Sequence, residues 1–195
     1  MRRAGRFALL MVDFVNPLDF EGAERLAPMA VKAAEATARL KARCRRLRWP
    51  TIYANDNFGR WHSEFTALVR RCEDLGGHPA RLVQLLRPDA RDFSVLKPRH
   101  SAFYGSPLGV LLEQVRATGV IVTGIAADSC VLFTGLDAFL RGYAVWVPRD
   151  CVASKSAARR DAALAQMRDA AKIWTGPSGA ALRSAAARSV RAQQA

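Results

Sequence analysis

Short apolar runs alternate along this chain with longer segments of helical periodicity, and this alternation limits the possible folds more than any other feature. The run Gly119 to Ile125 is β-branched and unbroken, as expected of a strand that is buried on both faces. Strands and helices in alternation form βαβ units, in which helices cover both faces of a parallel sheet. The sequence therefore predicts an α/β protein with a three-layer, Rossmann-like fold and a parallel sheet of about six strands.

The periodicity places the individual elements. We expect strands at Phe7 to Val15, Thr51 to Ala54, Phe93 to Leu96, Gly119 to Ile125 and Ala144 to Val147, and a shorter one near Ile173-Trp174. We expect helices at Ala23 to Leu47, Phe65 to Cys72, Pro107 to Ala117, Ser129 to Arg141 and Ala157 to Ala171, and a last helix from Ser178. Glycine and proline break the stretch between Asp56 and Asp92 into loops and short helices. Because no linker interrupts the 195 residues, we expect one domain over 1–195.

Composition narrows the class of protein further. The formal net charge is +13, but the basic residues are scattered as singles and pairs, which is typical of solvated helix faces, so we expect no nucleic-acid partner. No apolar stretch approaches the roughly 20 residues that span a bilayer, and the N-terminus shows no cleavage site of a signal peptide. The four cysteines (Cys44, Cys72, Cys130 and Cys151) lie too far apart for a metal motif or a disulfide framework. We therefore expect a cytoplasmic protein without membrane association.

Three ionisable residues lie where predicted strands end. Asp13 follows an apolar run directly, Lys97 closes another, and Cys130 opens the helix that follows a third. Ligands of open parallel sheets bind at the carboxyl ends of the strands, so these side chains are expected to converge. Each residue alone also has a structural explanation, as a solvated turn carboxylate, a surface lysine or a small buried thiol.

The chemistry of these residue types fits a nucleophile with its base. A thiol in the first turn of a helix faces free backbone N–H groups, and these, together with the ammonium of Lys97, are expected to favour the thiolate of Cys130. The same N–H groups could stabilise an oxyanion. Asp13 could accept the thiol proton and later deliver it to a leaving amine. The pattern predicts a cysteine hydrolase that needs no histidine.

Three motifs, "ALLMVDF", "VLKPRHSAFYGSPL" and "VIVTGIAADSCVLFTGLDAFLRGYAVWVPRDCVAS", resemble the isochorismatase-like cysteine hydrolases, which include nicotinamidases and N-carbamoylsarcosine amidohydrolase. The resemblance covers roughly Phe7 to Val152. It implies a catalytic triad of Asp13, Lys97 and Cys130 and a cis peptide bond before Ala126. It also implies an oxyanion hole formed by the backbone amides of Ala126 and Cys130.

The chain departs from the family pattern in ways that concern the substrate. Val15 and Ala127 stand where many members have glutamine and threonine. Nicotinamidases bind a metal through an Asp-x-His pair, whereas the corresponding stretch here is Asp56-Asn57-Phe58. We expect no metal and no cofactor, because only Asp56, His62 and His78 could gather as ligands. A nicotinamidase-like, metal-containing amidase that uses those three residues is the alternative.

The expected reaction is hydrolysis of a C–N bond in a small amide or carbamoyl compound through a thioester acyl-enzyme. True isochorismatases lack the cysteine, so Cys130 argues against their chemistry. Candidate substrate-binding residues are Phe14, Asn57, Trp61, Tyr104 and Phe133, all of which could instead serve packing. A catalytically silent binding protein of the same fold is a further alternative. The resemblance also implies a homo-oligomer, either a dimer or a tetramer.

Overall fold

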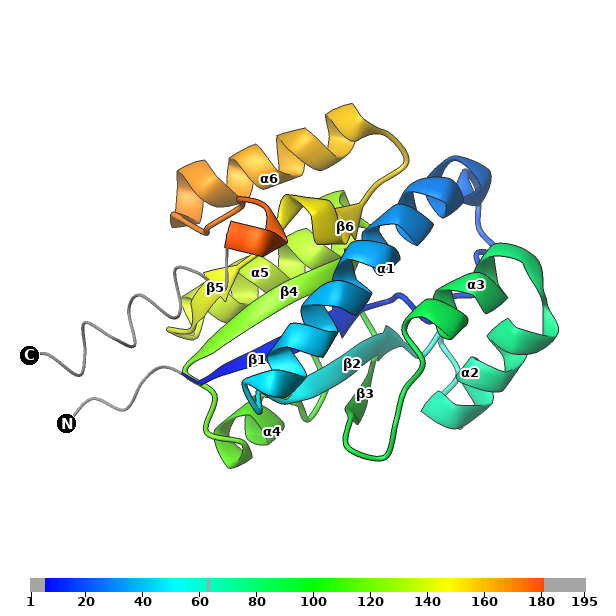
Figure 1. Cartoon of the computed structure of the whole chain (residues 1–195), viewed down its shortest axis with the longest axis horizontal. Helices are drawn as coiled ribbons and strands as arrows, with labels where there is room; N and C mark the ends of the chain where they lie inside the picture. The colour runs from blue at the N-terminus through cyan, green and yellow to red at the C-terminus, as the bar shows by residue number, and fades with distance from the viewer. Residues whose placement is uncertain (1–5, 63, 181–195) are drawn as a thin grey trace, which may run out of the picture.

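The computed structural model describes residues 6–62 and 64–180, which form an α/β fold around one parallel sheet (Figure 1). The strands are β1 (Phe7–Val12), β2 (Thr51–Asp56), β3 (Phe93–Lys97), β4 (Gly119–Ile125), β5 (Ala144–Trp146) and β6 (Val152–Ala153). Five of them follow the order β3-β2-β1-β4-β5 across the sheet. The sixth, β6, pairs with the last two residues of β4, Gly124 and Ile125. Every pairing is parallel, which confirms the predicted fold class.

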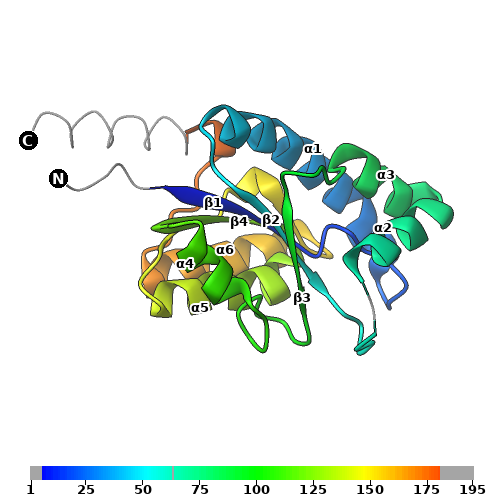
Figure 2. The same cartoon turned by 90° about the horizontal axis from the view of Figure 1, so that it is seen from below.

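Helices cover both faces of the sheet (Figure 2). One layer contains α1 (Ala23–Arg46), α2 (Phe65–Asp74) and α3 (Gly77–Leu85), and the other contains α4 (Leu108–Gln114), α5 (Leu132–Leu140) and α6 (Ala157–Ala171). A π-helical turn (Ala127–Val131) leads from β4 into α5, and a 3-10 turn (Arg149–Cys151) precedes β6. No helix in residues 6–62 and 64–180 combines the length and the apolar character needed to cross a membrane.

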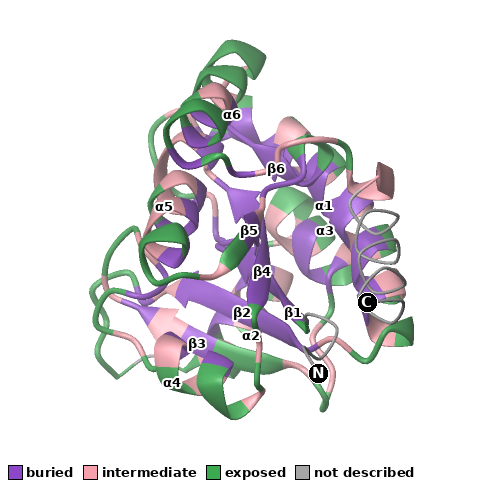
Figure 3. Ribbon diagram, turned by 90° about the vertical axis from the view of Figure 1, so that its left-hand side faces the viewer, coloured by how far each residue is buried: buried purple, intermediate pink, exposed green. Residues whose placement is uncertain are grey.

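The central strand β1 explains why the core has two halves. All six of its residues are buried, and successive side chains point to opposite faces. Leu9 and Met11 pack in the cluster that contains α1, whereas Leu10 and Val12 pack in the cluster that contains α4 and α6. Figure 3 shows the buried sheet running between the two helical layers. A strand that is apolar on both faces can only be a central one, as its sequence predicts.

Strand β1 is shorter than predicted, because it ends at Val12 and not at Val15. Asp13 adopts a left-handed backbone conformation with φ of 53°, which extended strands do not accommodate. The chain therefore turns, and Phe14 and Val15 enter the core beside α1. This change of direction places the Asp13 side chain beyond the end of the strand.

Strand β6 was not predicted from the sequence, and α3 was predicted only as an unplaced short helix between Asp56 and Asp92. Pro79 lies in the first turn of α3, where a missing N–H group leaves no hydrogen bond unmade, so the glycines and the proline mark the start of a helix here. Strand β6 has two residues, too few for any periodicity. The expected strand near Trp174 is a single bridge to Trp146. The helix predicted from Ser178 falls, beyond residue 180, outside the described residues.

Candidate active site

Asp13, Lys97 and Cys130 meet at one edge of the sheet. Asp13 follows β1, Lys97 is the last residue of β3, and Cys130 lies in the π-helical turn after β4. The Asp13 Oδ2 and Lys97 Nζ atoms are 2.8 Å apart, and the same Nζ lies 3.5 Å from Cys130 Sγ. The Cys130 thiol is also close enough to the Asp13 carboxylate for each side chain to shift the pKa of the other. Their predicted convergence is confirmed, since parallel strands carry all three to the same edge.

The backbone fixes the Asp13 carboxylate in place. Its own N–H donates to the carbonyl of Ala54 at 3.0 Å, which ties the end of β1 to β2. Its Oδ1 atom accepts the backbone N–H of Asp56 at 2.7 Å. Oδ2 therefore remains directed at Lys97, and the side chain is only 6% exposed.

A second carboxylate, that of Asp56, joins this group. Asp56 ends β2, the strand between β1 and β3, and is in register with Lys97. Its Oδ2 lies 3.5 Å from Lys97 Nζ, and its Oδ1 accepts the N–H of Phe58 at 2.6 Å. One buried ammonium thus lies between two carboxylates. Sequence reasoning considered Asp56 only as a metal ligand, although its place at a fourth strand end was a visible signal.

Burial sets the protonation behaviour of the three residues. It raises the pKa of Asp13 above its ordinary value, and the opposing effect of Lys97 does not cancel it. Burial alone would lower the pKa of Lys97, but the neighbouring Asp13, Cys130 and Asp56 outweigh it and raise that pKa. Lys97 is consequently a permanent cation at neutral pH.

The prediction that Cys130 rests as a thiolate is wrong, because the pKa of its thiol is raised and not lowered. Burial, followed by the charge of Asp13, raises the pKa of this thiol to about 12. Lys97 acts in the opposite direction but with less effect. The residue also lies in a π-helical turn and not in the first turn of an α-helix. The raised pKa favours the neutral thiol at neutral pH, and Cys130 is the only one of the four cysteines that is not fully buried.

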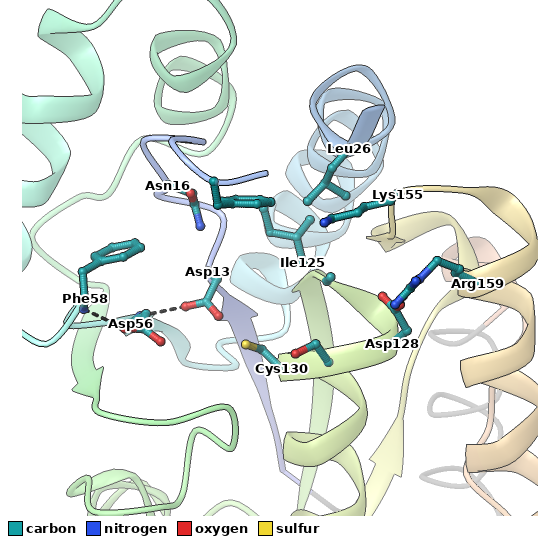
Figure 4. A pocket seen from close by; sticks show the side chains of 13 residues that line it. Asp13, Asn16, Leu26, Asp56, Phe58, Ile125, Asp128, Cys130, Lys155 and Arg159 are labelled. Atoms are coloured by element: carbon teal, nitrogen blue, oxygen red, sulfur yellow. Dashed lines mark hydrogen bonds and ion pairs between the residues drawn. The ribbon is translucent and has the colours of Figure 1, made fainter. Parts of the chain in front are cut away.

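Cys130 and Asp13 border a cavity of about 410 Å³ that opens at this edge of the sheet (Figure 4). Its walls combine apolar and charged groups from β2, β4, α1, α6 and the loops that follow the strands. The lining residues are Asp13, Asn16, Phe20, Leu26, Asp56, Phe58, Ile125, Ala126, Asp128, Ser129, Cys130, Lys155 and Arg159. Its volume suits a small molecule.

The peptide bond between Ile125 and Ala126 is cis, as the family resemblance implied. Ala126 and Cys130 both border the cavity. The assignment of their amides to an oxyanion hole stays a prediction.

A hydrogen-bonded group anchors the turn that carries Cys130. The Ser154 hydroxyl donates to Asp128 Oδ1 at 2.6 Å, and Arg159 Nε donates to Oδ2 of the same carboxylate at 2.5 Å. The N–H of Asp128 in turn donates to Ser154 Oγ at 3.3 Å. The turn that carries Cys130 is thereby fixed to Ser154, after β6, and to the first turn of α6.

The five residues predicted to bind substrate lie outside the cavity. Phe14 is fully buried in the core, because the chain turns inward after Asp13. Asn57 is also buried, and its Oδ1 accepts the N–H of Gly59. Trp61, Tyr104 and Phe133 are 77%, 61% and 53% exposed on the surface. Other side chains line this cavity, and a role of these five residues in substrate binding stays a prediction.

The ligand set of the metal alternative is not assembled in the described part of the chain. No group of three or more histidine, cysteine, aspartate or glutamate side chains in residues 6–62 and 64–180 is placed to hold a metal ion. His78 lies in the first turn of α3 and borders a different surface hollow, with Pro17 and Glu24. His62 is exposed in the loop after β2. Asp56 instead contacts Lys97.

Comparison with known proteins identifies the family. The family model that describes the isochorismatase domain matches residues 7–185 of this chain. The uncharacterized isochorismatase family protein YaaI of Bacillus subtilis is 36% identical over 160 residues, which are 82% of this chain and 87% of that protein. Maleamate amidohydrolase of Pseudomonas putida is 28% identical over 154 residues, 76% of this chain and 72% of that enzyme.

Among solved structures, N-carbamoylsarcosine amidase from Thermoplasma acidophilum has a TM-score of 0.68 and 25% identity, over 89% of this chain and 96% of that one. The chain belongs to the isochorismatase-like hydrolase family.

Proposed function

We propose that this protein is a cysteine amidohydrolase that cleaves the C–N bond of a small amide or carbamoyl compound. One observation carries the proposal: a partly exposed thiol lies beside a buried carboxylate and a buried ammonium, at the wall of a small cavity. A nucleophile in contact with its base is the arrangement that covalent hydrolysis requires.

In the first half of the reaction, Asp13 accepts the proton of the Cys130 thiol while Sγ forms a bond with the carbonyl carbon of the substrate. The amides of Ala126 and Cys130 donate to the oxygen, which becomes negative. Asp13 then gives its proton to the nitrogen as the C–N bond breaks, so the amine leaves neutral. A thioester on Cys130 remains.

In the second half, Asp13 accepts a proton from water as the water oxygen attacks the thioester carbon. The C–S bond breaks, the acid is released, and the proton returns to Sγ to restore the thiol. Lys97 stays charged throughout and stabilises each negative charge that forms on Asp13 or on Sγ. The cycle is closed without any group beyond these side chains and water.

The relatives support this class of reaction. Maleamate amidohydrolase and N-carbamoylsarcosine amidase are named for hydrolysis of an amide and of a carbamoyl compound. YaaI carries no named activity. Within the class, the present chain is therefore expected to release ammonia or an amine from a small substrate.

Ammonia release from a panel of small amides and carbamoyl compounds, with maleamate included, tests the proposal. We expect turnover of at least one compound by the wild-type protein and none by the Cys130→Ala and Cys130→Ser variants. Turnover that survives in either variant would show that Cys130 is not the nucleophile.

A further inference from the structure

Two cations, Lys155 and Arg159, stand at the rim of the cavity across from Asp56 (Figure 4). Lys155 belongs to the segment between β6 and α6, and Arg159 lies in the first turn of α6. Both side chains border the same cavity as Cys130. The mechanism above uses neither of them.

The two cations differ in how far they are neutralised. Arg159 is paired with Asp128, so that its charge is balanced within the wall. The ammonium of Lys155 donates to the backbone carbonyl of Glu21 at 2.5 Å and lies 5.8 Å from the centre of the Phe20 ring. Within residues 6–62 and 64–180, no carboxylate lies within ion-pair distance of it. Two of its three N–H donors remain available for a ligand.

The backbone around Gly22 makes room for this position of Lys155. A Cβ atom at residue 22 would lie 2.9 Å from the lysine Nζ and 3.0 Å from its Cδ. Gly22 also has a φ of 78°, a conformation that glycine adopts without strain. The lysine can therefore lie across the start of α1, with its ammonium at the cavity rim.

When its acidic and basic side chains are ionised, the cavity consequently has two ends of opposite charge. At one end, Asp13 and Asp56 share a single ammonium, that of Lys97, which leaves one excess negative charge. At the other end, the pair of Arg159 and Asp128 cancels, and Lys155 leaves one excess positive charge. Between the two ends lie Cys130 and apolar wall residues that include Leu26 and Ile125.

We propose that Lys155 binds a carboxylate of the substrate, so that the substrates are small carboxylic acids that carry an amide or ureido group at their other end. The N–H groups of that amide face the carboxylates of Asp13 and Asp56, and the apolar wall contacts a short carbon spacer. This inference rests on the proposed function, but it concerns recognition and not the chemical step. A cavity of about 410 Å³ limits the spacer to a few carbon atoms.

Binding to the Cys130→Ser variant tests the inference without turnover. The probes are succinamate, a monoanionic half-amide, and succinamide, its neutral diamide, titrated by calorimetry at low salt. We expect succinamate to bind about threefold to fivefold more tightly, as a partly exposed ion pair allows. We expect Lys155→Met to remove this preference and Lys155→Arg to keep it. Equal binding of the two probes, or a preference unchanged by Lys155→Met, would overturn the inference.

Lys172→Met is the matched control. The Lys172 ammonium also donates to a single backbone carbonyl, that of Asp169, but the residue follows the far end of α6 and does not border the cavity. The control removes the same net charge, so any effect of overall charge appears in both variants. We expect it to leave the preference for succinamate intact.

A second measurement uses alkylation rates and does not depend on the affinity of a probe. Iodoacetate and iodoacetamide alkylate the same thiol and differ in charge, so the ratio of their rates at Cys130 reports the local field. We expect the ratio of the iodoacetate rate to the iodoacetamide rate to fall about threefold to fivefold in Lys155→Met and to stay constant in Lys172→Met. An unchanged ratio in both variants would contradict the inference. Anion preference without amide turnover would instead overturn the proposed function alone.

Discussion

The carboxylate of Asp13 and the ammonium of Lys97 form an ion pair, with 2.8 Å between Oδ2 and Nζ, and their side chains are 6% and 0% exposed. Such a pair is costly to bury and more costly to break, because removal of one partner leaves a charge without compensation. Asp13 is thus expected to serve both stability and turnover. The two roles can be measured separately.

Asp13→Asn is expected to lower the free energy of unfolding by about 3 kcal/mol, because Lys97 keeps only Asp56 as a charged partner. The double variant Asp13→Asn with Lys97→Met should recover much of that stability, since no unpaired ammonium remains. Both variants should lose turnover by about a hundredfold or more, because the base is absent. Urea denaturation and ammonia release give the two readouts. A stable and active single variant would contradict the assignment.

The pH dependence of turnover should show an acidic limb set by Asp13. The pKa of Asp13 is raised above 3.8. As pH falls, Asp13 therefore becomes protonated at a pH above 3.8, and it can then no longer accept the thiol proton in the proposed mechanism. Initial rates measured as a function of pH test this prediction. An acidic limb with its midpoint at or below pH 3.8 would show that the pKa of Asp13 is not raised.

Alkylation of Cys130 should accelerate continuously with pH. Because the pKa of this thiol is raised to about 12, no plateau of thiolate reactivity is expected below pH 10. Cys130 should still be labelled before Cys44, Cys72 and Cys151, which are buried. Mass-spectrometric mapping after brief iodoacetamide treatment, with Cys130→Ser as the blank, measures both. A plateau near neutral pH would mean that the resting group is a thiolate after all.

Exhaustive chelation and dialysis should leave the rate of hydrolysis unchanged. In the proposed mechanism, nucleophile and base are both protein side chains. The carboxylate of Asp56 contacts Lys97, and His78 borders another hollow. The rate is measured before and after treatment, with metal analysis of the dialysed sample. Loss of activity that added zinc, manganese or iron restores would favour the nicotinamidase-like alternative.

The fold and the convergence of Asp13, Lys97 and Cys130 could be predicted because they depend on strong local signals. A strand that is apolar on both faces must be central, and a charged residue at its carboxyl end must lie at the ligand-binding edge. Asp13 follows from this reasoning, and Lys97 and Cys130 follow from their places at the end of β3, an edge strand, and in the turn after β4. The cis bond before Ala126 came from the family resemblance.

The cavity walls could not be predicted, because they depend on how loops pack. Phe14 turns into the core owing to the left-handed conformation of Asp13, which its sequence does not signal. Lys155 reaches the cavity through β6, a strand too short to detect. The protonation state of Cys130 was missed because burial outweighs the nearby cation, and burial is known only from the structure.

The pairing of β1 with β4 has a consequence for how the protein folds. The Thr123 hydroxyl of β4 donates to the Leu10 carbonyl of β1, across a sequence separation of 113 residues. Contacts this distant close large loops and form slowly. Asp13 and Cys130 cannot meet until β4, from the later half of the chain, has docked beside β1. Recovery of catalytic activity in a refolding experiment will therefore mark completion of the sheet and not the earlier collapse of the chain.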